Sequence, residues 1–285
     1  MRFSHLSLGA LALAVATPAF ADPKPASPAD PAAAMPADAP EPAATAADGD
    51  TAPPPAVTIT GSVTLVSDYR FRGISQTNLQ PAIQGSLTIT HESGLYASVW
   101  SSSTSGYVTY TANGNQEIDA IVGFKKTVSG VTLDAGVLYY IYPQSRPAGD
   151  MSSANFFEPY ADIAYTVGPV TAKVTVNYAF SQKALALDQG ASGLLKNNDN
   201  VYLAGDLSAA IPKTPISLSA HLGHTWGPSW LSLGNEYTDW GLGVSVTWKN
   251  LTLGANYVDT SGVFGLANGK NAARSGVVIS LGASF

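Results

Sequence analysis

The stretch Tyr237–Trp248 reads YTDWGLGVSVTW, and from Trp240 to Trp248 every second residue is large and apolar while those between are small or polar. A period of two residues is typical of a β-strand with one apolar face. Trp240 and Trp248 stand eight residues apart on that face, which corresponds to about 27 Å along a strand. With the tilt of barrel strands, this length suits the apolar band of an outer-membrane barrel.

The same alternation returns along the chain in segments separated alternately by tight turns and by long connections. Short turns at one end and long loops at the other are typical of outer-membrane barrels. We therefore predict an all-β fold, a transmembrane antiparallel up-and-down β-barrel of about 12 strands with both termini on the periplasmic side. The predicted strands span residues 57–71, 80–91, 95–101, 116–126, 131–142, 155–167, 170–181, 200–211, 216–226, 237–248, 251–260 and 274–285.

Aromatic residues of the apolar faces stand near the strand ends, where they would form two girdles at the boundaries between membrane and water. The predicted girdle at the long-loop end holds Tyr69, Phe71, Tyr139, Phe157, Tyr178, Phe180, Trp226, Trp240 and Tyr257. The predicted girdle at the short-turn end holds Phe124, Tyr165, Trp248 and Phe285.

The chain ends on the apolar face of its last predicted strand, at Phe285. A terminal aromatic residue on such a strand resembles the recognition signal of outer-membrane barrel assembly, so Phe285 is the expected contact with the assembly machinery. The last strand should pair with the first, because an open sheet edge in lipid leaves backbone groups unpaired.

The N-terminal part of the chain has a different composition. Arg2 precedes an apolar run over Leu6–Ala16, and Ala19–Ala21 is a small-x-small cleavage pattern, which together are typical of a secretory signal peptide. The next segment is rich in Pro and Ala and has no aromatic residue, so it should stay disordered and serve as a tether or as a solubilising spacer. The predicted division is a signal peptide over residues 1–21, a disordered Pro/Ala-rich periplasmic arm over 22–56 and an outer-membrane β-barrel over 57–285.

The composition excludes several functions. Among 285 residues there is no Cys, which rules out disulfides, thiol catalysis and Cys–zinc sites. Only 12% of residues are charged and the net charge is −6, which argues against nucleic-acid binding. The four His show no clustered pattern, so we expect neither a metal nor a cofactor.

The segment Val66–Thr77, VSDYRFRGISQT, follows the first apolar strand. It resembles the N-terminal signature of the TorF-type porins, the proteobacterial Gcw_chp family, and the resemblance extends over residues 57–285. It implies an outer-membrane porin-like barrel. It implies no defined solute and no catalytic residues.

Charged residues occupy the lumen-facing positions of the predicted strands, eight acidic and four basic, with Arg274 near the mouth. Charges inside a barrel set its ion selectivity, and this acid excess predicts a mild cation preference. The alternative is that these groups pair across neighbouring strands and only hold the wall in shape. The candidate pore-lining residues are Asp68, Arg70, Arg72, Glu117, Asp119, Asp134, Glu158, Asp162, Lys173, Asp206 and Asp239, with Lys125 as the fourth base.

These features favour a porin-like channel in the outer membrane of a Gram-negative cell, with membrane lipid and small solutes or ions as partners and no enzymatic activity. One alternative is a plugged barrel with a structural or adhesive role. The loop over 181–200 is the candidate plug, with apolar docking points at Ala184–Leu187 and Leu194–Leu195, unless it is a surface loop. Another alternative is an outer-membrane hydrolase around Ser219 and His221, which share the lumen face; no G-x-S-x-G motif supports it.

Overall fold

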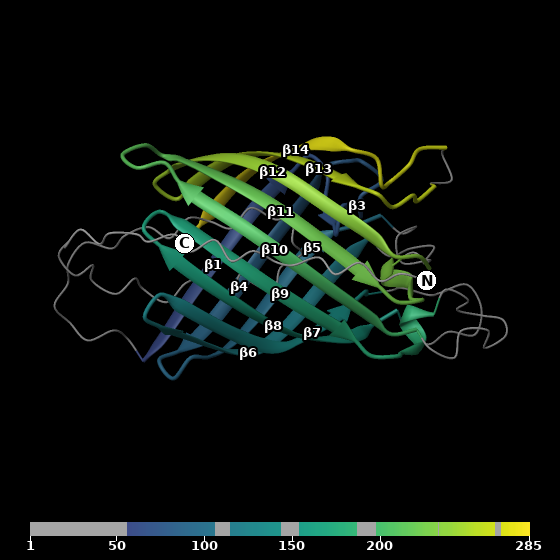
Figure 1. Cartoon of the computed structure of the whole chain (residues 1–285), viewed down its shortest axis with the longest axis horizontal. Helices are drawn as coiled ribbons and strands as arrows, with labels where there is room; N and C mark the ends of the chain where they lie inside the picture. The colour runs from purple at the N-terminus through teal and green to yellow at the C-terminus, as the bar shows by residue number, and fades with distance from the viewer. Residues whose placement is uncertain (1–55, 106–114, 144–153, 187–197, 233, 266–268) are drawn as a thin grey trace, which may run out of the picture.

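The chain folds into a closed barrel of twelve antiparallel strands, each paired with the barrel strands that precede and follow it (Figure 1). The predicted fold class is therefore confirmed. The computed structural model describes residues 56–105, 115–143, 154–186, 198–232, 234–265 and 269–285. The predicted signal peptide over 1–21 and the predicted arm up to residue 55 lie outside the described residues.

The observed strands agree with the predicted segments to within two residues at each end, with one exception. The first strand ends at Val66 instead of continuing to residue 71, because the chain there turns into the barrel. The barrel strands are β1 Val57–Val66, β4 Ala82–His91, β5 Leu95–Ser103, β6 Gln116–Val128, β7 Val131–Ile141, β8 Phe156–Val167, β9 Val170–Ala179, β10 Asn200–Ala210, β11 Ile216–Trp226, β12 Tyr237–Trp248, β13 Leu251–Thr260 and β14 Gly276–Ser284.

Tight turns connect the strands at one end of the barrel. Between β6 and β7 the turn is Ser129–Gly130, with φ angles of 51° and 80°. Two left-handed residues in a row are the geometry of a type I′ turn, whose twist matches that of paired strands. The chain enters the barrel at this same end, because Val57 pairs with His91 at the close of β4.

The barrel closes between its first and last strands. β1 pairs with both β14 and β4, so no strand edge is left open along this seam. Beyond β14, Phe285 and Gly61 exchange two backbone hydrogen bonds of 2.9 Å each. The phenyl ring of Phe285 covers Gly61 so closely that a Cβ at residue 61 would lie 2.7 Å from it. The C-terminal residue is therefore part of the closing joint.

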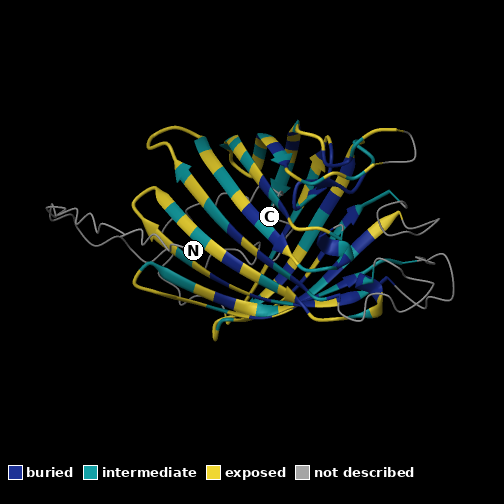
Figure 2. Cartoon of the chain, turned by 45° about the vertical axis from the view of Figure 1, so that its right-hand side comes forward, coloured by how far each residue is buried: buried dark blue, intermediate teal, exposed yellow. Residues whose placement is uncertain are grey.

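The outer face of the barrel is apolar and exposed. Along each strand exposed residues alternate with less exposed ones (Figure 2), and Leu242 and Val122, for example, are each 64% exposed. Tyr139 is half-buried and stacks on Phe157 at a ring distance of 4.2 Å. The exposed aromatic residues are Phe124, Phe157, Tyr165, Tyr178, Phe180, Trp226, Trp240, Trp248, Tyr257 and Phe285, all of them predicted for the outer face.

The interior differs between the two ends of the barrel. Buried residues gather toward the end with the long loops (Figure 2). Near the short turns, inward positions such as Thr166, Ser208 and Ser219 are exposed instead. The barrel is thus packed at the long-loop end, while part of its inner wall at the other end is accessible to water.

Helical structure is confined to two single turns of 3-10 helix in the described ranges, η2 Lys183–Leu185 and η3 Trp230–Ser232. In the part of the chain that the structure describes, no helix is both long and apolar enough to cross a membrane.

Replacing Gly61 by Val should impair barrel closure, because the new side chain would collide with the ring of Phe285. We expect a smaller fraction of heat-modifiable, folded protein on electrophoresis and a lower melting temperature. Gly85→Val on β4 is the matched control, since a Cβ there would lie 3.4 Å from its nearest neighbour, an ordinary contact. An equal loss of folded protein in both variants would contradict a specific role for the contact between Phe285 and Gly61.

Candidate functional site

The connection between β1 and β4, residues 67–81, folds into the packed half of the barrel, and we call it the internal loop. Two short strands, β2 Arg70–Phe71 and β3 Ile74–Ser75, form a hairpin within it. Arg72 and Gly73 make its turn with φ angles of 48° and 78°, the type I′ pattern. Gly73 is also required by space, because a Cβ there would lie 3.0 Å from both Asp239 and Thr260.

Asp68 holds the internal loop together. Its carboxylate accepts hydrogen bonds from Ser75 Oγ at 2.6 Å and Thr77 Oγ1 at 2.9 Å. It also forms an ion pair with Arg70 Nε at 2.5 Å. Each of these groups is buried, and a buried charge is tolerated only when it is paired and hydrogen-bonded.

Arg70 ties the internal loop to the connection between β13 and β14. Its Nη1 donates to the carbonyl oxygens of Ala272 at 3.2 Å and Arg274 at 2.8 Å. The backbone N–H of Ser75 donates to the carbonyl of Ala272 at 3.0 Å. The contact with Arg274 is thus made by the backbone of that residue.

Arg72 reaches the wall on the other side of the lumen. Its guanidinium pairs with Glu158 on β8 at 2.8 Å, donates to Asn200 Oδ1 on β10 at 3.0 Å and lies 4.2 Å from the ring centre of Tyr202. Burial acts to lower the pKa of Arg72, but the Glu158 carboxylate raises it, and the net shift is upward. Arg72 therefore stays charged and fixes the tip of the hairpin against β8 and β10.

Two aromatic residues of the internal loop overturn a prediction. Tyr69 and Phe71 were predicted in the outer girdle, on the assumption that the first strand continues to residue 71. Tyr69 is instead buried, packs edge-on against Trp100 at 5.3 Å and donates to Glu117 at 3.2 Å. Phe71 packs against Tyr140 at 6.1 Å. The physical reason is the burial of Asp68, Arg70 and Arg72, which draws the whole segment inward.

The remaining candidate residues lie on the inner wall, as predicted. Several form ion pairs, between Lys125 and Asp134 at 3.2 Å and between Lys173 and Asp206 at 3.6 Å. Pairing of charges across neighbouring strands, the alternative to a role in selectivity, therefore accounts for several of these residues. All of the following are buried, apart from half-buried Lys173 and Asp206: Asp68, Arg70, Arg72, Glu117, Asp119, Asp134, Glu158, Asp162, Lys173, Asp206 and Asp239.

His221 takes part in a polar network across β10, β11 and β12. Its Nδ1 lies 2.7 Å from Asp206 and its Nε2 lies 2.8 Å from Asp239. With both ring nitrogens at carboxylates, neither is available as a general base toward Ser219, so the hydrolase hypothesis loses its catalytic pair. His224 lies on the other face of β11, against Trp226 and Thr238.

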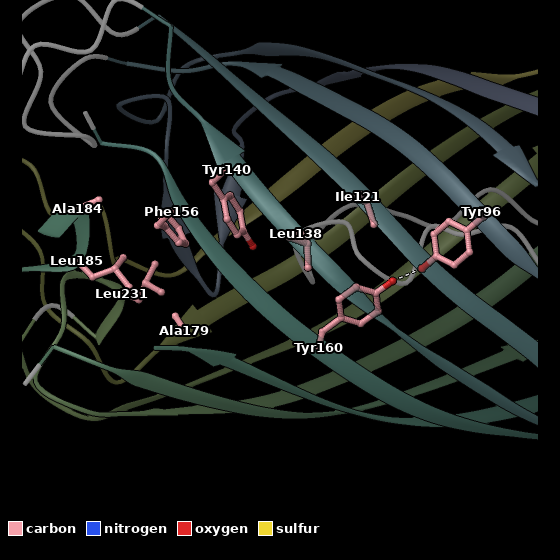
Figure 3. Packing of buried hydrophobic residues seen from close by; sticks show 10 residues of the cluster. All are labelled: Tyr96, Ile121, Leu138, Tyr140, Phe156, Tyr160, Ala179, Ala184, Leu185 and Leu231. Atoms are coloured by element: carbon pink, nitrogen blue, oxygen red, sulfur yellow. Dashed lines mark hydrogen bonds between the residues drawn. The ribbon is translucent and has the colours of Figure 1, made fainter. Parts of the chain in front are cut away.

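Inward tyrosines were missed by the sequence reasoning. Tyr96, Tyr160 and Tyr202 each lie against a glycine of a neighbouring strand, where a Cβ would collide with the tyrosine. The hydroxyls of Tyr96 and Tyr160 meet over Asp134 (Figure 3), and that of Tyr202 donates to Asp239 at 3.0 Å. The signal was present as tyrosines and glycines at lumen-facing positions of adjacent strands. The glycines are Gly123, Gly136 and Gly223.

The predicted plug over 181–200 is described only at its two ends. Ala184 and Leu185 are buried in a cluster with Tyr140, Phe156 and Leu231 (Figure 3), so these two docking points are confirmed. Leu187, Leu194 and Leu195 lie outside the described residues. The internal loop, which was not considered as a plug, is the segment seen to occupy the lumen.

Removing the charge of Arg72 should destabilise the barrel strongly. Arg72→Gln leaves Glu158 buried without its cation, which costs about 3–5 kcal/mol. Lys173→Gln is the control, because that ion pair is partly exposed and should cost less than about 1 kcal/mol. The free energy of unfolding in urea, followed by tryptophan fluorescence in micelles, checks both. The double variant Arg72→Gln/Glu158→Gln should recover part of the loss, and similar losses in Arg72→Gln and Lys173→Gln would contradict the assignment.

A closed barrel with an apolar exterior and a polar interior defines an outer-membrane-type β-barrel protein. Residues 50–285 match the family described as "Bacterial protein of unknown function (Gcw_chp)". The chain belongs to that family, which confirms the Gcw_chp part of the predicted resemblance. No curated protein matches the chain.

Several solved structures resemble the fold at low sequence identity. A structure titled "Unveiling the Mechanism Behind the in-meso Crystallization of Membrane Proteins" is 10% identical with a TM-score of 0.50, over 80% of this chain and 83% of that chain. The KdgM porin is 9% identical with a TM-score of 0.49, over 80% and 98%, and was also solved in complex with disordered oligogalacturonate. The COG4313 outer membrane channel from Pseudomonas putida F1 is 14% identical with a TM-score of 0.45, over 84% and 99%.

Proposed function

We propose that the protein is a porin-like channel of the outer membrane, through which ions or small solutes diffuse passively, and that the internal loop narrows its pore. The observation that carries the proposal is the internal loop itself, which is anchored inside the barrel by Arg70 and Arg72. A barrel needs no polar segment in its lumen merely to close. A segment held there by the buried ion pair of Arg72 with Glu158 and by the hydrogen bonds of Arg70 restricts passage in a defined way.

The water-accessible half supports the same function. Inward residues near the short turns, such as Ser208 and Ser219, are small, polar and exposed. Water thus reaches part of the inner wall from that end. The proposed path runs from the long-loop mouth, past the internal loop, to the end with the short turns.

The location and orientation belong to the proposal. Export by the signal peptide over 1–21 and the arm over 22–56 would place the short-turn end and both termini in the periplasm. The apolar outer face would contact membrane lipid, and Phe285 would present the assembly signal. Membership of the TorF-type porins remains part of this proposal.

A mild cation preference follows from the charges of the lumen. Eight acidic side chains face four basic ones, and the ion pairs leave an acid excess. Such a wall attracts cations and repels anions. We therefore do not propose for this chain the oligogalacturonate named with the KdgM porin, because that ligand is a polyanion.

A closed barrel with a structural role is the second candidate, and the packing of the long-loop half favours it. An adhesive role would use exposed aromatic residues of the loops, for which the sequence offers Trp230, Tyr237 and Tyr107. Tyr237 is buried inside the barrel and Trp230 packs on Phe264 at 5.6 Å, while Tyr107 lies outside the described residues. These placements weaken the adhesive form.

Removing the internal loop should widen the pore. Val66 and Ala82 are paired across β1 and β4, so a short Gly-Ser linker in place of residues 69–79 can join the strands without opening the barrel. Planar-bilayer recordings should show small discrete steps for the full mature chain and several-fold larger steps for the shortened one. If both proteins are folded and neither gives current steps, the result would favour the second candidate, a barrel with a structural role.

Neutralising two buried acids should reduce selectivity. Glu117→Gln together with Asp119→Asn should move the reversal potential in a salt gradient toward zero, because both carboxylates lie on the inner wall beside the internal loop. Asp259→Asn is the control, since Asp259 lies on the outer face of β13 and accepts from Tyr257 there. An unchanged reversal potential in the double variant would count against a role of these acids in the path.

A further inference from the structure

Asp119 on β6 is a carboxylate without a partner. It is 0% exposed, and in the described part of the chain neither of its oxygens has a hydrogen-bond partner. An ionised carboxylate in such a place is very costly unless something compensates its charge. Its surroundings therefore indicate what it binds.

Aromatic side chains flank Asp119 on both neighbouring strands. In the register of the sheet it stands opposite Trp100 on β5 and opposite Tyr140 on β7, both buried. Tyr69 of the internal loop packs on Trp100. The indole N–H of Trp100 has no partner either, so it does not satisfy the carboxylate. Asp119 thus lies in a row between two aromatic residues.

The charge of this region is not balanced by basic residues. Glu117, the next inward residue on β6, is also buried and accepts a hydrogen bond from the hydroxyl of Tyr69 at 3.2 Å. The two arginines of the internal loop are engaged by other acids, Arg70 by Asp68 and Arg72 by Glu158. Among the ion pairs of the described residues, Glu117 and Asp119 have no basic partner.

We infer that Asp119, Glu117 and the ring of Trp100 form a binding site for a small ammonium-type cation, either the ammonium ion or the head group of an alkylamine. The ring of Tyr140 stacks on Phe156 at 4.4 Å and serves only as a wall of the site. Carboxylate oxygens accept the hydrogen bonds of an N–H cation. Aromatic faces attract such a cation more when it is desolvated. No group of three or more His, Cys, Asp or Glu in the described ranges could hold a metal ion, which favours this class of cation over a coordinated metal.

This inference rests on the proposed channel and names its solute class. The site lies beside Tyr69 of the internal loop, at the point where that loop meets the wall. A cation that passes the internal loop would exchange its water for the two carboxylates and the ring of Trp100. Cationic amines would therefore be retained where anions are repelled.

The test measures binding without any membrane current, so a silent channel does not affect it. The full mature chain, refolded in micelles, is melted in chlorides of ammonium, methylammonium, potassium and sodium at constant ionic strength. A cation bound by the folded state raises the melting temperature in a saturable way. We expect saturable stabilisation by ammonium and methylammonium, and none by sodium.

Variants locate the site. Asp119→Asn should weaken the apparent ammonium affinity by about tenfold or more, since it removes a charge-assisted hydrogen bond. Asp259→Asn, the same change at an acid on the outer face of β13, should keep the ammonium effect. Trp100→Leu should also weaken the apparent ammonium affinity, because it removes the aromatic face of the site, and it decides the question if Asp119→Asn does not fold.

Three outcomes would overturn the inference. Equal melting temperatures in all four salts would mean that the buried acids are protonated and bind no cation. Equal stabilisation by potassium and ammonium, insensitive to Trp100→Leu, would assign the acids to an alkali ion. An undiminished ammonium effect in Asp119→Asn would place the bound cation elsewhere.

Discussion

Closure of the backbone hydrogen-bond network is the constraint on which the rest of the structure depends. In a membrane every backbone N–H and C=O must find a partner within the protein. Twelve strands achieve this only because β1 pairs with β14 as well as with β4. The closing joint is made by Phe285 and Gly61, where the smallest residue of β1 accommodates the ring of the last residue. The pairing of β1 with β14 thus fixes where Phe285 lies.

Closure also creates the lumen, and the internal loop depends on it. Polar residues of a short hairpin can be buried only where partners surround them on all sides. The wall supplies Glu158 and Asn200 for Arg72, and the connection from β13 to β14 supplies carbonyls for Arg70. These contacts come from strands far apart in sequence. The internal loop therefore acquires its structure together with the complete barrel.

The sequence predicts the strands well and the interior poorly, for one physical reason. Alternation of apolar and polar residues reports on a face exposed to lipid, and it placed eleven barrel strands to within two residues at each end. It failed at Tyr69 and Phe71, whose spacing continues the pattern of β1 although both lie inside. The clue was Asp68, Arg70 and Arg72, three charges in five residues. Their partners in the folded barrel, such as Glu158, could not be identified from spacing alone.

The charged residues of the inner wall are of two kinds, those paired with an opposite charge on a neighbouring strand and those without such a partner. Lys125 with Asp134, and Lys173 with Asp206, join neighbouring strands, so they hold the wall and contribute little net field. Glu117 and Asp119 have no such basic partner in the described chain, and they lie where the internal loop meets the wall. A field of one sign arises only from charges of this second kind. Selectivity should therefore depend on a few unbalanced acids beside the internal loop, and the total number of lumen acids is a poor guide to it.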